Sequence, residues 1–238
     1  MLPPRAPMHD FPDVVIHADE SAVRKHEHYD AAKAGDFVAA EMLISAFDDG
    51  LIERIGSMLG GRAVELVAVH ALESTGVNEI PAALARRFSH WLNLPVNDSI
   101  VQANSVGHTK ASGFHRLAHQ AQFVGPVTPW QSYFLVDDFV GQGGTLANLV
   151  GYIKVNGGRV LGATVLTGKP HSAKLAPDDA SIQSLRNKHG HEFETWWRER
   201  FGFGFDCLTR SEARYLENSP NARTIRDRLI AAGLEGGA

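Results

Sequence analysis

The sequence predicts an α/β fold built on a mostly parallel, doubly wound sheet. Short apolar runs that are typical of buried strands lie at residues 64–69, 133–136 and 159–166. Between them lie stretches whose apolar residues recur at helical spacing. The composition agrees, because 44% of the 238 residues are apolar and 21% are charged, as in ordinary globular domains.

Residues 1–61 are expected to form an amino-terminal arm and a helical segment. Residues 1–13 contain four prolines and no periodic pattern, which is typical of a loose arm, and an arm that folds over a neighbouring part of the chain is the alternative. Residues 34–59 carry apolar side chains at helical spacing, with a break at residues 48–50. This pattern predicts two short helices.

Residues 62–170 are expected to form the core. Its first strand, residues 64–69, is followed by Pro81, which suits the start of a helix, and that helix should end near Asn93. Residues 99–103 predict a second strand. Residues 104–130 show little periodicity, and so long a stretch inside a compact domain favours a functional loop.

The second half of the core predicts a strand, helix, strand unit. A strand over residues 133–136 leads through a glycine-rich turn into a helix with apolar residues from Leu146 to Ile153. The next strand follows over residues 159–166. A unit of this kind makes the two strands parallel and its crossover right-handed.

Residues 171–238 are expected to form a carboxyl-terminal extension, or hood. Its expected elements are a helix over residues 192–200, a strand over residues 203–208 and a last helix over residues 219–233. Thr209 and Glu212 have the spacing of a capping box, which predicts a helix start between them.

The charge and the cysteine content of the chain limit which partners it is expected to bind and in which cell compartment it is expected to lie. Because the formal net charge is −4, the protein as a whole has no positive electrostatic field that would attract nucleic acid. Cys207 is the one cysteine, so no internal disulfide can form, and the amino end lacks a signal-peptide pattern. No apolar run approaches the roughly 18 residues of a membrane span. We therefore expect a cytoplasmic protein without nucleic-acid or membrane partners.

The most informative segment is residues 134–146, FLVDDFVGQGGTL. Asp137 and Asp138 end a buried strand and can accept hydrogen bonds from the vicinal hydroxyls of a ribose. The turn that follows aims backbone N–H groups and the start of a helix at one phosphate, and it also supplies a hydroxyl. The residues of this turn are Gly141, Gln142, Gly143, Gly144 and Thr145. Together they predict a site for a phosphorylated sugar.

The residue spacing does not match two other glycine-rich motifs. The dinucleotide fingerprint needs a glycine where this chain has Leu146, and the ATP-type P-loop needs a Lys-Ser or Lys-Thr ending that is absent. Two alternatives for the aspartate pair stay open, namely a solvated helix-start cap and a metal site of another α/β family.

Residues 134–146 resemble the 5-phosphoribosyl-1-pyrophosphate (PRPP) motif of type I phosphoribosyltransferases, an apolar run, two acids and a loop ending Gly-Gly-Thr. The resemblance implies that Asp137 and Asp138 hold the ribose hydroxyls and that residues 141–145 hold the 5-phosphate. Gly141 and Gln142 differ from the residues that the PRPP motif of the family most often has at these two positions. Because Gly141 replaces the aspartate of hypoxanthine-guanine enzymes, that subtype is disfavoured.

A second segment resembles the pyrophosphate loop of adenine-type members of the family. Its residues are Glu73, Ser74, Thr75 and Gly76, followed by Pro81. Thr75 stands where the family usually has arginine, which weakens the subtype assignment. An ordinary strand-to-helix connection remains the alternative interpretation of this segment.

The unpatterned stretch before residue 130 matches the position of the family's mobile loop, which closes over the reaction centre with basic residues. Its basic residues include Lys110, His115, Arg116 and His119. The first three are our candidates for catalytic groups, because a cation in a closing lid can stabilise departing pyrophosphate and exclude water.

The resemblance covers the core and implies transfer of the phosphoribosyl group of PRPP to a nitrogen acceptor, such as a nucleobase, with release of pyrophosphate. It also implies Mg²⁺, held mainly through PRPP rather than by protein ligands, and a homodimer. The altered residue Thr75 motivates an alternative, a regulatory protein that binds PRPP without turnover.

Overall fold

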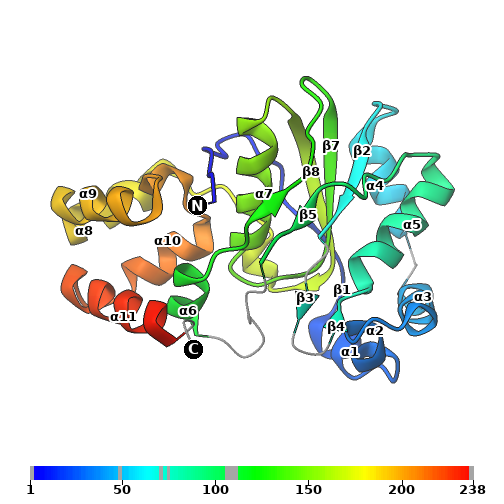
Figure 1. The fold of residues 1–238 in the computed structure, drawn as a ribbon, viewed down its shortest axis with the longest axis horizontal. Helices are drawn as coiled ribbons and strands as arrows, with labels where there is room; N and C mark the ends of the chain where they lie inside the picture. Colours follow the sequence, from blue (N-terminus) through cyan, green and yellow to red (C-terminus); the bar gives the residue numbers. More distant parts are fainter. Residues whose placement is uncertain (1–2, 48–49, 70–71, 74–75, 105–111, 236–238) are drawn as a thin grey trace.

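A parallel four-stranded sheet forms the middle layer of the protein (Figure 1). Across the sheet the strands are β1 (Val15–Ala18), β8 (Arg159–Gly168), β7 (Ser132–Val140) and β2 (Glu65–Ala68). Each neighbouring pair is parallel. This computed structural model describes residues 3–47, 50–69, 72–73, 76–104 and 112–235. The predicted α/β class with a mostly parallel sheet is confirmed.

Helices cover both faces of the sheet. They are α3 (Phe37–Ala46), α4 (Leu51–Leu59) and α5 (Ile80–Leu92) on one face and α7 (Gly144–Val155) on the other. Phe134 and Val136 of β7 pack with the first group, whereas Tyr133 and Leu135 pack with α7. Successive side chains of a strand point to opposite faces, so a continuous apolar run is buried on both sides. The doubly wound arrangement is therefore confirmed.

The predicted helices of the first ninety residues are present. Residues 34–59 contain α3 and α4, and Gly50 precedes α4 with φ of 67°. The helix expected from Pro81 is α5, which ends at Asn93 in the left-handed conformation. Two further short helices, α1 (Glu20–Arg24) and α2 (Tyr29–Lys33), lie before them.

Several strands differ from expectation. The edge strand β1 was not predicted, because four residues carry too little pattern. Strand β7 runs four residues past the predicted end at Val136, through both aspartates to Val140. The expected strand over residues 99–103 is reduced to β5 (Val101–Gln102), which pairs antiparallel with β6 (Phe123–Val124) outside the main sheet.

The described part of the arm at residues 1–13 is not loose but folds over a neighbouring part of the chain, which was the alternative left open by the sequence. Arg5 and Met8 are 8% and 1% exposed. The arm crosses α7 at Gly151, where an added Cβ would lie 2.3 Å from the Pro4 carbonyl oxygen. The absence of a side chain at Gly151 thus lets the two backbones approach, which a scan for local periodicity does not detect.

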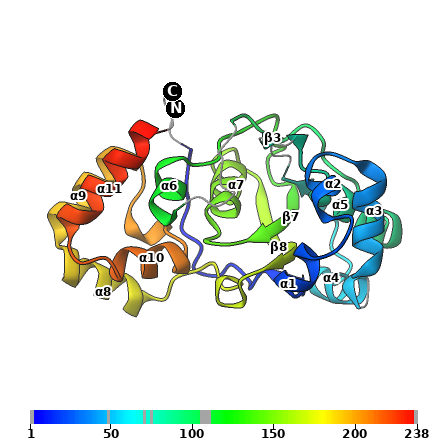
Figure 2. The same cartoon turned by 90° about the horizontal axis from the view of Figure 1, so that it is seen from below.

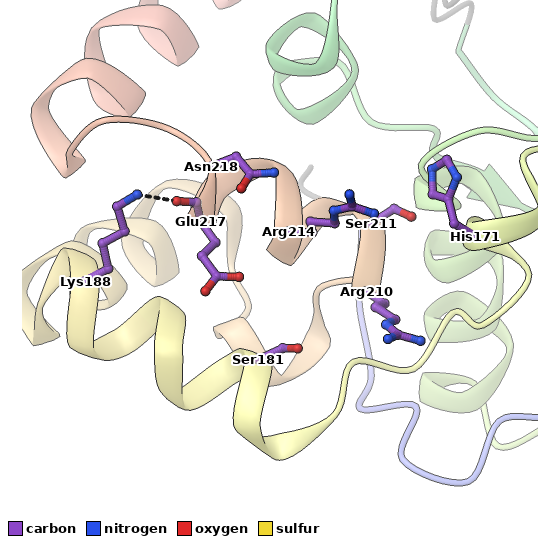
Figure 3. A pocket seen from close by; sticks show the side chains of 8 residues that line it. All are labelled: His171, Ser181, Lys188, Arg210, Ser211, Arg214, Glu217 and Asn218. Atoms are coloured by element: carbon purple, nitrogen blue, oxygen red, sulfur yellow. Dashed lines mark hydrogen bonds between the residues drawn. The ribbon is translucent and has the colours of Figure 1, made fainter.

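The carboxyl-terminal helices form the hood beside the sheet (Figure 2). They are α8 (Asp179–His189), α9 (His191–Phe201), α10 (Arg210–Glu217) and α11 (Ala222–Glu235). Helix α6 (Gly113–Ala118) comes from the middle of the chain and packs into the same apolar cluster through Phe114 and Leu117. An open cavity lies between α8 and α10 (Figure 3).

The strand expected over residues 203–208 is absent, and a 3₁₀ turn over Phe205–Cys207 takes its place. Phenylalanine and glycine alternate over residues 201–205. In the structure each phenylalanine packs around Trp197, with ring centroids of Phe203 and Phe205 6.1 and 6.0 Å away. The predicted capping box of Thr209 and Glu212 is confirmed at the start of α10.

Within the described ranges, no helix is both long and apolar enough to cross a lipid bilayer.

Candidate functional site

Asp137 and Asp138 lie side by side in the last part of β7. The Asp137 residue is 6% exposed, and its Oδ1 atom accepts a hydrogen bond of 2.8 Å from the Asp138 N–H. Burial, and secondly the neighbouring charge of Asp138, raise the pKa of Asp137 well above its ordinary value. A carboxyl group that retains its proton can donate as well as accept a hydrogen bond.

Asp138 is paired with a lysine from the amino-terminal helices. Its Oδ2 atom lies 2.9 Å from the Nζ atom of Lys33, at the end of α2, and both side chains are largely buried. The second oxygen of Asp138 is left to accept other hydrogen bonds. The segment ahead of the core therefore supplies a cation to the candidate site.

The glycine turn (residues 141–145) connects β7 to α7. Gly143 is the N-cap of α7 with φ of 79°, and an added Cβ there would lie 2.4 Å from the Leu175 Cδ2 atom. Only glycine fits this position without strain. The first N–H groups of α7, from Gly144 and Thr145 onward, have no acceptor inside the helix. Such a turn is suited to binding a phosphate group.

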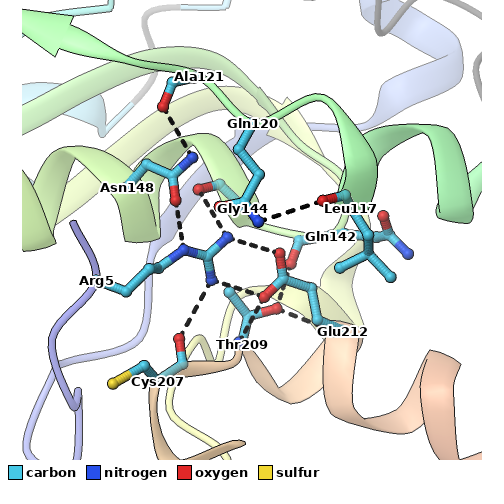
Figure 4. Close-up of polar contacts among 10 residues, drawn as sticks. All are labelled: Arg5, Leu117, Gln120, Ala121, Gln142, Gly144, Asn148, Cys207, Thr209 and Glu212. Atoms are coloured by element: carbon cyan, nitrogen blue, oxygen red, sulfur yellow. Dashed lines mark hydrogen bonds and ion pairs between the residues drawn. The ribbon is translucent and has the colours of Figure 1, made fainter. Parts of the chain in front are cut away.

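Two hydrogen bonds hold the glycine turn from the hood and arm sides (Figure 4). The Thr209 hydroxyl donates to the Gln142 carbonyl oxygen at 2.6 Å, and Arg5 Nη2 donates to the Gly144 carbonyl oxygen at 3.5 Å. These hydrogen bonds fix two carbonyl groups of the turn and thereby stabilise its conformation. The Oε1 atom of Gln142 is buried and has no hydrogen-bond partner among the residues that the structure describes.

Behind the turn lies a buried ion pair between Arg5 and Glu212. The guanidinium donates to both carboxylate oxygens, at 2.8 and 2.9 Å, and the two side chains are 1% and 3% exposed. Arg5 also donates to the Asn148 side chain of α7 and to the Cys207 carbonyl oxygen. A Cβ added at Gly144 would lie 2.8 Å from Glu212 Oε1, so this carboxylate adjoins the turn. Arg5 offsets its negative charge there.

Arg116 of α6 lies against the glycine turn. A Cβ added at Gly141 would be 2.7 Å from the Arg116 Nη1 atom, so the missing side chain at Gly141 makes room for the guanidinium. Burial and the charge of Arg24 lower the pKa of Arg116. Arg24 itself lies over the Phe139 ring, 5.2 Å from its centroid. Two arginines distant in sequence thus meet beside the turn.

The other loop candidates have different surroundings. His115 packs against His119 with ring centroids 4.3 Å apart and the rings tilted by 34°, and the His119 ring contacts the Ala232 carbonyl oxygen of α11 at 2.8 Å. Lys110 lies outside the described residues. Of the predicted basic residues, Arg116 is therefore the one that the structure brings to the turn.

The predicted pyrophosphate loop is a small hairpin in which β3 (Leu72–Glu73) pairs antiparallel with β4 (Gly76–Val77). Ser74 and Thr75 lie outside the described residues. Gly76 has φ of 136°, and an added Cβ would lie 2.4 Å from the Ala34 carbonyl oxygen. Glycine at this position lets the hairpin pack against the amino-terminal helices.

The sequence interpretation missed Arg5, Arg24 and Lys33, and it identified Glu212 only as part of a helix cap. Each contacts groups far away in the chain: Lys33 is 105 residues from Asp138, and Arg5 is 207 residues from Glu212. No local motif encodes such contacts.

No known family model matches the chain. It is 39% identical over 229 residues to protein TraN of Escherichia coli, which covers 96% of this chain and 51% of that protein. It is 38% identical over 145 residues to an uncharacterized protein of Haemophilus influenzae, which covers 60% of this chain and 32% of that protein. The chain thus spans about half of the first relative and about a third of the second.

Among solved structures, an adenine phosphoribosyltransferase superposes with a TM-score of 0.38 and 13% identity, over 60% of this chain and 79% of that one. The UMP synthase of Leishmania donovani gives a TM-score of 0.33 and 12% identity, over 74% of this chain and 34% of that one. Both TM-scores are below 0.5.

Proposed function

We propose that this chain binds PRPP and transfers its 5-phosphoribosyl group to a nitrogen acceptor of the nucleobase class, with release of pyrophosphate. The observation that carries the proposal is the glycine turn between the aspartate pair of β7 and the start of α7, with the Arg116 guanidinium against Gly141. Acceptors for hydroxyl groups and donors for a phosphate thus lie within one short segment.

In this proposal the main-chain N–H groups of residues 141–145 and the Thr145 hydroxyl bind the 5-phosphate. The ribose hydroxyls donate to Asp137 and Asp138. Pyrophosphate lies near residues 73–76, whose backbone amides would receive it. Arg116 adds positive charge, and Lys110 and His115 belong to the same closing segment. Position and electrostatics, rather than a covalent intermediate, supply the catalysis.

Mg²⁺ fits this arrangement as a partner of the substrate. Among the described residues no group of three or more His, Cys, Asp or Glu side chains could hold a metal ion. The aspartate pair precedes the turn and Glu212 adjoins it, and Arg5 already neutralises Glu212. A hard cation that prefers phosphate oxygens and water would therefore be held mainly by PRPP, where it screens the pyrophosphate charge.

The aspartate pair gives the direct test. In the variant Asp137→Asn with Asp138→Asn, PRPP affinity measured by calorimetry with Mg²⁺ should fall at least about a hundredfold, because two acceptors for ribose hydroxyls are lost. The matched control, Asp13→Asn with Asp227→Asn, removes two exposed carboxylates and should bind as the wild type does. Unchanged affinity in a folded site variant refutes the site.

Turnover is tested separately by pyrophosphate release from PRPP with a panel of nucleobases. The alternative of a regulator that binds PRPP without turnover is motivated by Thr75, which stands where the resembling family usually has arginine. Release with one acceptor supports the transferase. Tight PRPP binding with no release under any acceptor supports the regulator.

A further inference from the structure

The hood contains a second polar cavity, distinct from the aspartate pair and the glycine turn. It has a volume of about 610 Å³ and lies between α8, α10 and the turn after β8 (Figure 3). Arg210, Ser211 and Arg214 line it from α10, Lys188 from α8 and His171 from the turn after β8. We call this cavity the hood pocket. Its size is in the range of small-molecule sites.

Positive charge dominates the hood pocket although the whole chain has a net charge of −4. Three cations, Lys188, Arg210 and Arg214, face one carboxylate, Glu217. That carboxylate accepts a hydrogen bond from the Ser184 hydroxyl, and Lys188 donates to the Glu217 carbonyl oxygen at 2.5 Å. Among the residues that the structure describes, neither Arg210 nor Arg214 forms an ion pair. The pocket therefore has a local excess of cations.

The position of the two arginines does not favour the helix that carries them. Arg210 is the first residue of α10, where the helix dipole disfavours a cation. Arg214 follows at i+4, and like charges at that spacing repel. Asp178, the N-cap of α8, already accepts a hydrogen bond from the Ser181 N–H at 2.8 Å; hydrogen bonding to Ser181, and to a smaller degree the charge of Arg210, lowers the pKa of Asp178. An anion in the pocket would offset both unfavourable effects.

The lining also indicates how a ligand would be recognised. Every described residue that lines the hood pocket has a polar or charged side chain. Apart from the imidazole of His171, the described lining residues carry no aromatic ring on which a base could stack, so recognition rests mainly on charge and on donors from Ser211 and its neighbours. Arginine forks match phosphate oxygens in pairs. We propose that the hood pocket binds a small polyphosphorylated anion.

The hood pocket adjoins the glycine turn through one residue. Thr209, whose hydroxyl donates to the Gln142 carbonyl oxygen, immediately precedes Arg210. The proposal does not rest on the PRPP site, because its residues belong to the hood and to the turn after β8. Its test is designed to give an answer whether or not PRPP binds.

Inorganic tripolyphosphate is the probe, titrated into the full chain by calorimetry at low salt. The wild type should bind it, and Arg210→Gln with Arg214→Gln should weaken that binding at least about tenfold. The control, Arg159→Gln with Arg223→Gln, removes two exposed arginines from other surfaces and should stay within about twofold of the wild type. Unchanged binding in the pocket variant, equal weakening in the control or no binding by the wild type overturns the proposal.

Two further readouts separate this site from the candidate PRPP site and from a folding defect. The pocket variant without ligand should melt no lower than the wild type, and tripolyphosphate should raise the melting temperature of the wild type more than that of the variant. The variant Asp137→Asn with Asp138→Asn should keep its tripolyphosphate affinity. Its loss would show that the anion depends on the aspartate site, and would overturn a separate pocket.

Discussion

Asp137 combines a position suited to ligand binding with an unfavourable environment for a charge. It is buried in a central strand beside Asp138, and burial raises its pKa. The charge of Lys33 favours the ionised form of Asp137, but Lys33 is paired directly with Asp138 instead. A carboxyl group in these surroundings lowers the stability of the folded protein, as residues that bind ligands often do.

Asp137→Asn should therefore stabilise the folded protein at neutral pH by at least about 1 kcal/mol. Below about pH 4 the carboxyl is protonated in the folded and unfolded states alike, so the variant and wild type should differ little. As the pH rises, the unfolded carboxyl ionises while the folded one resists, so the wild type loses stability that the asparagine variant keeps. Urea unfolding at pH 4 and pH 8 measures this. A gap that is wider at pH 4 contradicts it.

At the level of residues, the sequence located the aspartate pair and the turn because they are contiguous and follow a recognisable strand. It did not locate Lys33 or Arg24, since each becomes relevant only when α1 and α2 fold against the end of the sheet. Arg116 was among several basic residues of one stretch. Only its contact with Gly141 distinguishes it from His115.

The link between β7 and α7 is the element that sets the candidate site. Gly143 starts the helix in a left-handed conformation and packs against Leu175, which is 1% exposed. Thr209 and Arg5 hold the neighbouring carbonyl groups. The turn is therefore fixed by its backbone and by contacts from two other parts of the chain.

Gly143→Ala should destabilise the protein by about 2 kcal/mol or more, because the new methyl group meets Leu175 as well as an unfavourable φ. Gly60→Ala is the matched control: Gly60 is also left-handed, with φ of 57°, but nothing lies within 4 Å of an added Cβ. It should cost only about 1 kcal/mol. Chemical unfolding of both variants compares them, and equal losses would show that the contact with Leu175 is unimportant.

Elements with strong local patterns were predicted, and weakly patterned ones were not. The buried run of β7 and the helical periodicity of α4 and α5 survive in the structure. The four residues of β1 form a strand because β8 offers an open edge. The phenylalanines at alternating positions before α10 lie in a turn rather than a strand, because their side chains pack into an aromatic cluster and not onto a sheet.

At the scale of the molecule, the arm, the sheet layer and the hood meet at the Arg5 guanidinium. Arg5 contacts Asn148 of α7, Glu212 of α10 and the Cys207 carbonyl oxygen before it. Asn148 in turn donates to the Ala121 carbonyl oxygen at 2.9 Å. The network therefore joins three parts of the chain directly behind the glycine turn.

Arg5→Met should destabilise the fold by about 3 to 5 kcal/mol, because it leaves Glu212 buried without its partner. Adding Glu212→Gln should restore a large part of that loss, since the glutamine removes the charge yet still accepts from the Thr209 N–H. Urea unfolding of the two single variants and the double variant gives the coupling. If the stability lost in the double variant equals the sum of the losses in the two single variants, Arg5 and Glu212 do not stabilise the fold as a coupled pair.

By itself, the sequence determined the α/β class, most of the helices and the one segment in which acids, glycines and a helix start stand together. Those features depend on neighbours in the chain, whose spacing is visible without a structure. The tertiary structure decided which distant cations accompany that segment, how the arm and hood hold it and where the hood pocket lies. These depend on contacts between residues up to 207 positions apart, and such contacts exist only after the layers pack.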